Sequence, residues 1–463
     1  MRLCVHKNMR WILAVVCMLG SFAATANAQL LQGSITGNVF DPSNAAVVGA
    51  KVVATEQQTN FTRETTTNDQ GGYNLLTMPP GTYRITVTSP AFQTTNITGV
   101  TVSPEQITRR DVTLTVGQVT ENVTVSADAT TLQTDKAEVR DELNIKSLAN
   151  VPVPMGRNYQ MLFITMPGIS PPTNSNSFTA NSNRGLNFSV GGGYQGTNNI
   201  RVDGTGTFNM TALTVAQFIP ALEAIESVSV AGNSLDAEQT TGGGAVNITI
   251  KSGTNTLHGA FFMDHTNQHL QAYPWKADRT QANPKYINNQ YGATIGGPIK
   301  KDKLFYFASF EGTGLVQSAP FFAQVPNAAM RRGDLSAART TIYDPATGAA
   351  NGSNRVPFAN NIIPTGRIDP GVRALLARPE WLGPNQVGTG TTGLANNLLT
   401  NGSTYLRRAQ TDAKVNWNPT QKLSVFARLG WGNNYWTTPT QFGDLGGPGL
   451  SNTNTAQGFG GTN

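Results

Sequence analysis

Apolar and polar residues alternate in many short runs of this chain, and turn residues separate one run from the next. In one run Tyr83, Ile85 and Val87 alternate with polar residues, and the run AVNITI at 245–250 has the same period. Successive side chains of a β-strand point to opposite faces, so a two-residue period indicates a strand with one buried face. The pattern predicts a mainly β protein.

Between residues 29 and 117, short strands of this kind are separated by frequent turn signals. These signals are Asp41-Pro42, Asp69–Gly72 and Pro79–Gly81. Regularly spaced short strands with such turns are typical of a β-sandwich. Because the strands and turns are complete without later residues, 29–117 are predicted to form an N-terminal sandwich domain that folds by itself.

A longer alternating pattern appears in the part of the chain after residue 254. Apolar residues share one face of a predicted strand: Leu423, Val425, Ala427, Leu429 and Trp431. Small or polar residues share the other: Ser424, Arg428, Gly430 and Gly432. Strands of outer-membrane barrels alternate in this way, because one face meets lipid and the other the lumen. Residues 298–303 separate two further runs and predict a hairpin with a short charged turn.

Residues 312–403, by contrast, have no sustained period. They contain runs such as GDLS, IYDPATG and RVPFANNIIPTGRIDP, together with glycine and threonine stretches. Long segments without a period are typical of surface loops. A long surface loop over 312–403 is therefore predicted.

The first 28 residues have the pattern of a secretory signal peptide. Three basic residues precede the apolar run at 11–20, and Ala26-Asn27-Ala28 provides a small-residue cleavage site. The apolar run is too short to cross a membrane as a helix. We therefore predict export and a mature chain that begins at Gln29.

Composition narrows the possible functions further. Charged residues make up 13% of the chain, against about 25% in typical domains. Both cysteines, Cys4 and Cys17, lie in the signal peptide, which excludes a disulfide framework and a cysteine nucleophile from the mature chain. Cleavage removes 3 of 33 basic residues and no acidic ones, which leaves 30 basic against 27 acidic residues. The excess of basic residues in the mature chain is small, and a nucleic-acid partner is therefore not predicted.

Three consecutive glycines, Gly242, Gly243 and Gly244, come directly before the run at 245–250. A phosphate-binding loop is excluded, because its Gly-Lys-Ser/Thr opens a helix whereas Lys251 follows a strand. No dinucleotide-binding G-x-G-x-x-G opens a helix either. The glycines are expected to serve backbone geometry, since glycine permits tight bends and close approach.

Four motifs stand in order within the predicted sandwich. They are G-x-V-x-D at Gly37–Asp41, GAKV from Gly49, TNDQGGY at Thr67–Tyr73 and PPGTYRITV at 79–87. Together they resemble the carboxypeptidase regulatory-like domain. That resemblance implies a sandwich without a zinc site, and neither His-x-x-Glu nor His-Glu-x-x-His occurs in the chain.

Four further motifs follow: LNIKSLANVPVPMGRNYQMLFITMPGIS, NNIRVDGT, LEAIESVSVAGNSLDAEQTTGGGAVNITIKSGT and NNQYGATIGGPIKKDKLFYFASFEG. This series resembles the plug and first barrel strands of TonB-dependent outer-membrane receptors, in particular the Oar-like group that carries such a sandwich. The resemblance extends from about residue 30 to the end of the chain. It implies a connector at 118–134, a mixed α+β plug at 135–253 and a transmembrane β-barrel from 254 to 463.

The barrel implied by this resemblance is incomplete. Plugged transporter barrels have about 22 strands, whereas the pattern from 254 to 463 provides about five. The closing residues GGTN also lack the aromatic final strand of the resembling family. The chain is therefore expected to be truncated and to contain only the first barrel strands.

The resemblance implies a receptor and transporter of the outer membrane. Such a receptor binds an external ligand and imports it when a TonB-like energy-coupling protein moves the plug. The implied partners are a TonB-like protein, outer-membrane lipid and an external ligand, whose identity and contact residues the sequence leaves open. The sandwich is implied to lie in the periplasm, and no cofactor is expected.

The connector contains a β-prone stretch, Glu121–Ser126, which is called the docking segment below. The resembling receptors place their TonB-binding segment at this position, between an N-terminal domain and the plug. Val123 and Val125 alternate within it, which suits binding as an added strand. Glu121, Val123 and Val125 are therefore the candidate TonB-contacting residues, and a plain linker is the alternative.

Within the implied plug, the motif NNIRVDGT predicts a strand that ends in a turn at Asp203-Gly204. Arg201 and Asp203 are candidates for an internal ion pair or for the seam that releases the plug. The alternative is a turn cap by Asp203 and a lumen-facing Arg201. The resemblance further implies that the glycines at 242–244 let the plug backbone bend tightly against the barrel wall.

The sequence contains no complete catalytic or metal-binding constellation. The histidines beyond the signal peptide are His258, His265 and His269, and DHTNQH continues a strand, whereas a metal-binding pair at this spacing needs a helix. No Gly-x-Ser-x-Gly occurs, and the Glu223/Glu226 pair lies where structural roles predominate. The chain is predicted to be no enzyme and to bind no metal.

Composition alone equally allows a different class of protein, namely a secreted or surface-exposed β-sandwich protein that binds glycan or other cells. Such an adhesin has no need of the motif series from VPVPMGRNYQ to IKSGTN. That series favours the receptor.

Overall fold

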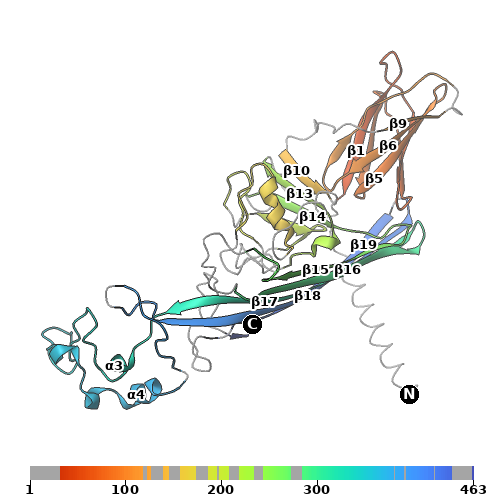
Figure 1. Cartoon of the computed structure of the whole chain (residues 1–463). Helices are drawn as coiled ribbons and strands as arrows, with labels where there is room; N and C mark the ends of the chain where they lie inside the picture. The colour runs from red at the N-terminus through yellow and green to blue at the C-terminus, as the bar shows by residue number, and fades with distance from the viewer. Residues whose placement is uncertain are drawn as a thin grey trace, which may run out of the picture. The chain divides into compact units, whose positions relative to one another are not determined.

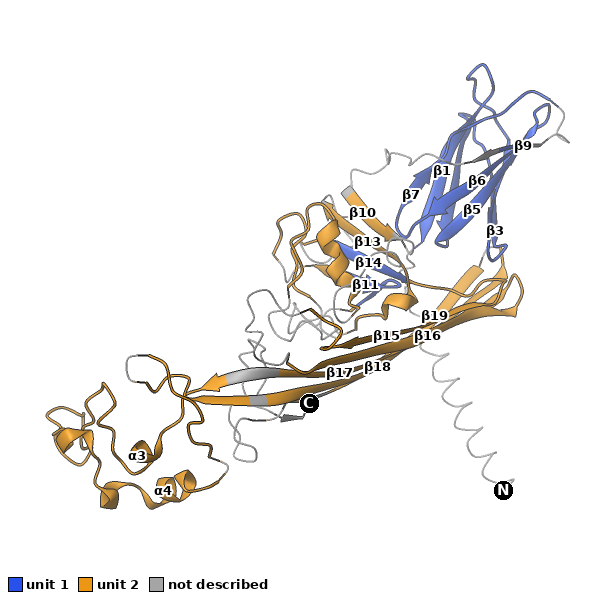
Figure 2. Ribbon diagram, in the orientation of Figure 1, with its two compact units in different colours: residues 1–139, 200–206, 245–249 blue, residues 140–199, 207–244, 250–463 orange. Residues whose placement is uncertain are grey.

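The computed structural model describes residues 32–117, 122–126, 139–144, 157–173, 186–194, 198–207, 218–233, 243–272, 284–379, 381–390, 393–421, 423–438, 440 and 461–462. The predicted signal peptide, Glu121 and Gly242 lie outside these residues. Among the described residues no helix has the length and apolar character needed to cross a membrane. Figure 2 shows two compact units, 1–139 with 200–206 and 245–249, and 140–199 with 207–244 and 250–463, called unit 1 and unit 2.

Two β-sheets form the N-terminal part of unit 1 (Figure 1). The first has the order β4 (Gly72–Met78), β1 (Gly33–Phe40) and β7 (Ile107–Arg109), and β8 (Val112–Thr113) also pairs with β1. The second has the order β3 (Thr62–Thr66), β2 (Lys51–Glu56), β5 (Gly81–Thr88), β6 (Thr94–Val102) and β9 (Asn122–Ser126).

The core of these two sheets is built from alternate residues of their strands. Ile35 and Leu75 come from the first sheet, and Tyr83, Ile85 and Val87 from the second. All five are at most 1% exposed. The Tyr83 hydroxyl donates a hydrogen bond to the Pro79 carbonyl oxygen at 2.7 Å, so the polar end of this buried ring is satisfied. The two-residue period predicted for this strand is confirmed.

Residues 29–117 expressed alone are expected to give a β-type circular dichroism spectrum and a cooperative thermal transition. The buried cluster is the reason, because its described members all lie between Ile35 and Leu114. A matched Ile85→Asp fragment is expected to lose the transition, since it buries an unpaired charge. A disordered spectrum for the unchanged fragment would rule out a domain with these bounds.

The turn predicted at Asp203-Gly204 joins β11 (Asn199–Val202) to β12 (Thr205–Gly206) in the structure. Val202 pairs with Thr205 in antiparallel register. Asp203 and Gly204 have φ angles of 46° and 84°, and two successive positive φ values are what a two-residue type I′ hairpin needs. The hairpin is therefore specified locally by the Asp-Gly pair.

The strand β14 (Ala245–Ile250) differs from the half-buried strand that its period predicts. All six of its residues are buried, Asn247 and Thr249 included. The Nδ2 of Asn247 donates to Oε2 of Glu105 over 2.7 Å, which satisfies one polar group of this strand. The local pattern indicates a strand, but burial of its second face depends on residues remote in the sequence.

Unit 2 contains all but the first residue of the strand β10 (Val139–Asn144), which lies beside β13 (Ile225–Asn233) in the sheet order. It also contains two short 3₁₀ helices, η2 (Tyr159–Thr165) and η4 (Leu222–Ala224). The side chain of Asn158 accepts the backbone N–H of Gln160 at 3.0 Å and so caps η2. In the part of the predicted plug that the structure describes, the helical component consists of such short 3₁₀ helices.

The largest sheet of unit 2 is an antiparallel succession of strands in chain order, as Figure 1 shows. Its strands are β15 (His258–Asn267), β16 (Tyr286–Lys300), β17 (Leu304–Ala323), β18 (Leu398–Thr420), β19 (Leu423–Thr438) and β20 (Gly461–Thr462). The predicted hairpin is present, with its turn at residues 301–303. Pro298 belongs to β16 rather than to the turn, and a register shift lies between Pro298 and Lys300.

One face of this sheet is apolar and exposed. Leu429 in β19 is 68% exposed and Phe261 in β15 is 75% exposed. Other exposed apolar residues of the sheet include Met263, Tyr291, Ile295, Phe310, Val415, Trp417, Leu423, Val425 and Trp431. The alternation predicted for 423–431 is therefore confirmed, and it extends over the neighbouring strands. Such a face suits contact with lipid.

The predicted bounds of the long loop, 312–403, are wrong at both ends. Strand β17 continues to Ala323 and β18 begins at Leu398, and these two residues pair across the strands. The connection is therefore 324–397, and it contains α3 (Ala328–Arg331), η5 (Ala359–Asn361), η6 (Thr365–Arg367) and α4 (Pro370–Leu376). The strand ends lack an apolar period, so backbone pairing between β17 and β18 decides their length.

Candidate functional site

The second face of the large sheet carries buried charged side chains. Glu311 in β17 lies directly opposite Gln410 in β18, so the two side chains leave the sheet on the same face. Asp412 and Lys414 follow Gln410 at two-residue steps on that face. Glu311 is 1% exposed and Asp412 is fully buried, although charged residues are almost never fully buried unless they are paired.

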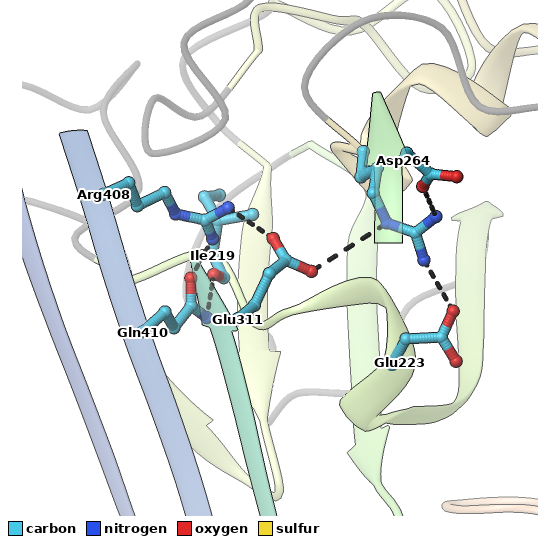
Figure 3. A network of polar contacts seen from close by, with 7 residues as sticks. Ile219, Glu223, Asp264, Glu311, Arg408 and Gln410 are labelled. Carbon is cyan, nitrogen blue, oxygen red and sulfur yellow. Dashed lines mark hydrogen bonds and ion pairs between the residues drawn. The ribbon is translucent and has the colours of Figure 1, made fainter. Parts of the chain in front are cut away.

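Glu311 and Arg408 form a buried ion pair on this face, drawn in Figure 3. Nη1 of Arg408 donates to Oε1 of Glu311 at 2.7 Å, and both side chains are at most 2% exposed. A second guanidinium nitrogen of Arg408 donates to the side-chain oxygen of Gln410. The Nε2 of Gln410 in turn donates to the carbonyl oxygen of Ile219 at 2.6 Å. The sheet is thereby bonded to a backbone group of the predicted plug.

Arg157, two residues before the start of η2, approaches the same face of the sheet from the predicted plug. Its guanidinium lies 2.5 Å from Glu223, 3.0 Å from Asp264 and 4.0 Å from Glu311, measured between nitrogen and oxygen atoms. The guanidinium carbon also lies 4.1 Å from the centre of the Phe262 ring, a cation–π distance. One arginine therefore links carboxylates of η4, β15 and β17.

The backbone of Arg157 is itself unusual, because its φ is 48°. A residue with a side chain pays a conformational cost in this region, and such strain is kept only where the surroundings enforce it. Here the next residue, Asn158, caps η2, and the guanidinium has three carboxylates within 4.0 Å. The positive φ of Arg157 therefore occurs where its side chain and the next residue are both held by contacts.

A second group of charges continues along the same face of the sheet. Nη2 of Arg428 in β19 lies 2.5 Å from Oδ1 of Asp412, and its guanidinium carbon lies 5.1 Å from the centre of the Phe218 ring. The Nζ of Lys414 donates to the carbonyl oxygen of Ile250 at 3.0 Å. These contacts again join sheet side chains to groups of the predicted plug.

These interactions define a charge network, consisting of Arg157, Glu223, Asp264, Glu311, Arg408 and Gln410. Buried ion pairs give little net stability compared with apolar packing, but removal of one partner is costly. Charged and polar groups are also well solvated when they separate in water, unlike an apolar core. While water is excluded, the network therefore holds specific partners together. When water enters, the charged groups become solvated and can separate.

The residues that the sequence suggested for the plug, Arg201 and the glycines at 242–244, do not belong to the charge network. Nη1 of Arg201 lies 3.7 Å from Oε1 of Glu105, and both residues belong to unit 1. Gly244 has no room for a side chain, because a Cβ there would lie 2.4 Å from Cβ of Val190. Close approach, rather than a positive φ, is what requires glycine at 244. Gly243 forms a bend beside it.

The docking segment is described only in its backbone for most residues. Asn122–Ser126 is the strand β9, so Val123 and Val125 lie in a strand as their alternation indicates. Glu121 and the side chains of both valines lie outside the description. Their proposed contact with a TonB-like protein remains a prediction.

The histidines do not gather into one site. His258 and His265 lie in the strand β15, and His269 lies in the turn after it. Nδ1 of His265 is 2.6 Å from the side-chain oxygen of Asn289. Among the described residues, no group of three or more histidine, cysteine and acidic side chains is arranged to hold a metal ion.

The sequence analysis missed the charge network, although one signal for it was present. In the stretch from Arg408 to Val415, polar residues alternate with small or apolar ones, which is the strand period with a polar rather than an apolar buried face. Arg157 and Glu311 carry no such signal, because each acquires its partners only through contacts with distant segments.

Comparison with known protein families identifies two regions of the chain. Residues 34–115 match the carboxypeptidase regulatory-like domain, and residues 249–463 match the outer membrane beta barrel domain. These findings confirm the resemblance of the sandwich and of the C-terminal strands.

A curated relative, the TonB-dependent transporter Oar of Myxococcus xanthus, is 27% identical over 451 residues. The alignment covers 86% of this chain and 40% of that transporter, so the chain spans less than half the length of its relative. The resemblance to the Oar-like group is confirmed, and a location in the outer membrane agrees with both this relative and the barrel-domain match.

Two solved structures show weaker similarity. The ferric enterobactin receptor of Pseudomonas aeruginosa, solved as a mutant with bound enterobactin, is 15% identical with a TM-score of 0.36, over 69% of this chain and 36% of the receptor. The siderophore receptor PirA of Acinetobacter baumannii is 16% identical with a TM-score of 0.28, over 65% of this chain and 48% of the receptor.

Proposed function

We propose that this chain, a homologue of a TonB-dependent transporter with an outer membrane β-barrel match and a carboxypeptidase regulatory-like domain, is part of an energy-coupled receptor. The receptor binds an external ligand at the cell surface. It admits the ligand when a TonB-like protein of the inner membrane pulls on the plug. The proposed plug is 135–253, and the proposed barrel strands begin at 254.

The observation that carries this proposal is the charge network. It joins Arg157 and Glu223 of the proposed plug to Asp264 and Glu311 of the proposed barrel wall. A permanent domain contact would be expected to use apolar packing, which resists separation in water. A contact made from charged groups separates when water enters, as movement of a plug requires.

The large sheet supports a location in the outer membrane. Its exposed apolar face fits lipid, while the opposite face carries the charge network. Barrels of this membrane have short periplasmic turns and longer external loops. The turn at 301–303 is short and the connection at 324–397 is long, so the long connection is assigned to the cell surface.

The relatives reported above are a transporter and receptors, and the proposed function includes no catalytic step. The alternative, a secreted sandwich protein that binds glycan or other cells, accounts for residues 34–115 alone. It offers no reason for a barrel-domain match at 249–463 or for the charge network. The receptor is therefore the favoured function.

Location and export have a direct test. The receptor is expected in the outer-membrane fraction of cells that express it, with Gln29 as its first residue, because Ala26-Asn27-Ala28 follows a short apolar run. N-terminal sequencing and membrane fractionation measure both. A variant with Ala26 and Ala28 changed to Arg should remain uncleaved. An intact Met1 on the unchanged receptor, or its recovery from the medium, would contradict the proposal.

A further inference from the structure

The connection between β6 and β7, residues 103–106, is more buried than a loop usually is. Ser103 and Pro104 are buried, and the side chain of Glu105 is 17% exposed. Connections run over the surface of most domains, because their backbone groups need water. In Figure 2 residues 200–206 and 245–249 of the predicted plug belong to the same compact unit as the sandwich. The burial indicates that the connection contacts other parts of this unit.

The carboxylate of Glu105 is shared between two strands of the predicted plug. Its Oε2 accepts a hydrogen bond from Nδ2 of Asn247 in β14 at 2.7 Å. Its Oε1 lies 3.7 Å from Nη1 of Arg201 in β11. Strands β11 and β14 are neighbours in their sheet, so one carboxylate of the sandwich bridges two adjacent plug strands. We call these three residues the sandwich latch.

The plug side of the sandwich latch is polar and buried. Asn247 is 1% exposed and Arg201 is 7% exposed. A buried charge is costly when its partner is removed, and the carboxylate of Glu105 is such a partner for Arg201. The polar groups of these two strands therefore fit a carboxylate better than they fit an apolar cover.

Glu105 is also held from the side of the sandwich. Its backbone N–H donates to the carbonyl oxygen of Gln32 at 3.3 Å, and its φ is 59°. A positive φ is uncommon for a residue with a side chain, so Glu105 adopts a specific backbone conformation. Because the sandwich contacts its backbone and the plug strands contact its carboxylate, movement of β11 or β14 away from the sandwich must break the sandwich latch.

We propose that the sandwich latch holds β11 and β14 in place in the resting receptor and opens when the plug moves. This inference rests on the proposed function and assigns a role to the sandwich, as a cap on the plug. The contacts are polar, and charged groups become solvated when they separate in water. Glu105 is then a positioning residue whose loss loosens these plug strands and leaves the rest of the receptor folded.

Glu105→Gln tests the proposal, because glutamine keeps the shape and an acceptor for Asn247 but loses the charge that faces Arg201. Hydrogen–deuterium exchange of the purified complete receptor is the readout. Amide exchange in 199–206 and 245–250 is expected to rise at least about threefold, while exchange in β5 and β17 stays within about 1.5-fold.

Glu64→Gln is the matched control. Glu64 pairs with Lys51 on the surface of the sandwich, where both side chains are 56% exposed, so its loss should leave exchange in the plug strands unchanged. A second variant tests the partner. In an Arg201→Gln receptor, Glu105→Gln should add less than about 1.5-fold to the exchange, because both changes remove the same ion pair.

Cells that produce the Glu105→Gln receptor should also become at least about twofold more sensitive to vancomycin, because a larger share of their receptors has a loosened plug. The intact outer membrane excludes this large glycopeptide. Cells with the Glu64→Gln receptor should keep the sensitivity of cells with the unchanged receptor.

Unchanged exchange in the Glu105→Gln receptor would overturn the proposal. So would an equal rise in β5 and β17, which a general loss of stability produces. Local loosening without added sensitivity to vancomycin would also overturn it, because the sandwich latch would then not keep the plug closed. Absence of the unchanged receptor from the outer membrane would instead reject the proposed function.

Discussion

Replacement of Glu311 by alanine is expected to destabilise the complete receptor by about 3–5 kcal/mol, the range measured when one partner of a buried ion pair is removed. The change leaves the guanidinium of Arg408 buried without the carboxylate that lies 2.7 Å from it. It also removes the carboxylate at 4.0 Å from Arg157. Urea unfolding of the refolded receptor in detergent, followed by tryptophan fluorescence, measures the loss.

Asp264→Ala is the matched control, because Asp264 contacts the same Arg157 but its side chain is 56% exposed. Exposed pairs contribute about 0–1 kcal/mol, so this variant should unfold near the unchanged receptor. Equal stability of the Glu311→Ala and Asp264→Ala receptors would contradict the assignment of Glu311 to a buried pair. Both variants remove one carboxylate. A difference in their stability therefore reports the effect of burial and not the effect of losing a charge.

Replacement of Val123 by proline is expected to abolish coupling to a TonB-like protein. Proline removes one backbone N–H and restricts the residue before it, and strand addition depends on main-chain hydrogen bonds. Capture of the complete receptor by the C-terminal domain of TonB should fall at least about tenfold. Uptake should fail with it, while binding of the external ligand should survive.

Val125→Ile is the control for this prediction, because it keeps the backbone and a β-branched side chain. It should leave capture and uptake within about twofold of the unchanged receptor. Normal uptake by the proline variant would leave residues 118–134 with the role of a linker. Loss of function in the isoleucine variant would point to side-chain recognition instead of strand addition.

The local features of the fold were predictable from the sequence. The period of two over Tyr83–Val87 indicates a strand with one face in the core, and the structure places those residues in β5. Asp203-Gly204 favours two positive φ values and so specifies its hairpin. Alternation at 423–431 indicates which side of β19 is apolar. Each of these properties depends on a few neighbouring residues.

The extent of pairing was not predictable in the same way. The ends of β17 and β18 resemble loop sequence, yet Ala323 pairs with Leu398. The docking segment resembles a linker, yet it pairs with β6. Backbone N–H and C=O groups can pair with the edge of a sheet whatever the side chains are. Side-chain periodicity therefore does not indicate where the pairing between two strands ends.

The sequence by itself determined the class of the protein, namely β-strands with turns, a carboxypeptidase regulatory-like domain and the apolar face of a membrane strand. Only the tertiary structure decided which charges meet. Arg157 reaches Glu223 across 66 positions and Asp264 across 107, and Arg408 reaches Glu311 across 97. The physical reason is range: periodicity and turn chemistry act between neighbours in the chain, whereas a buried charge needs a partner that only the completed topology brings within hydrogen-bonding distance.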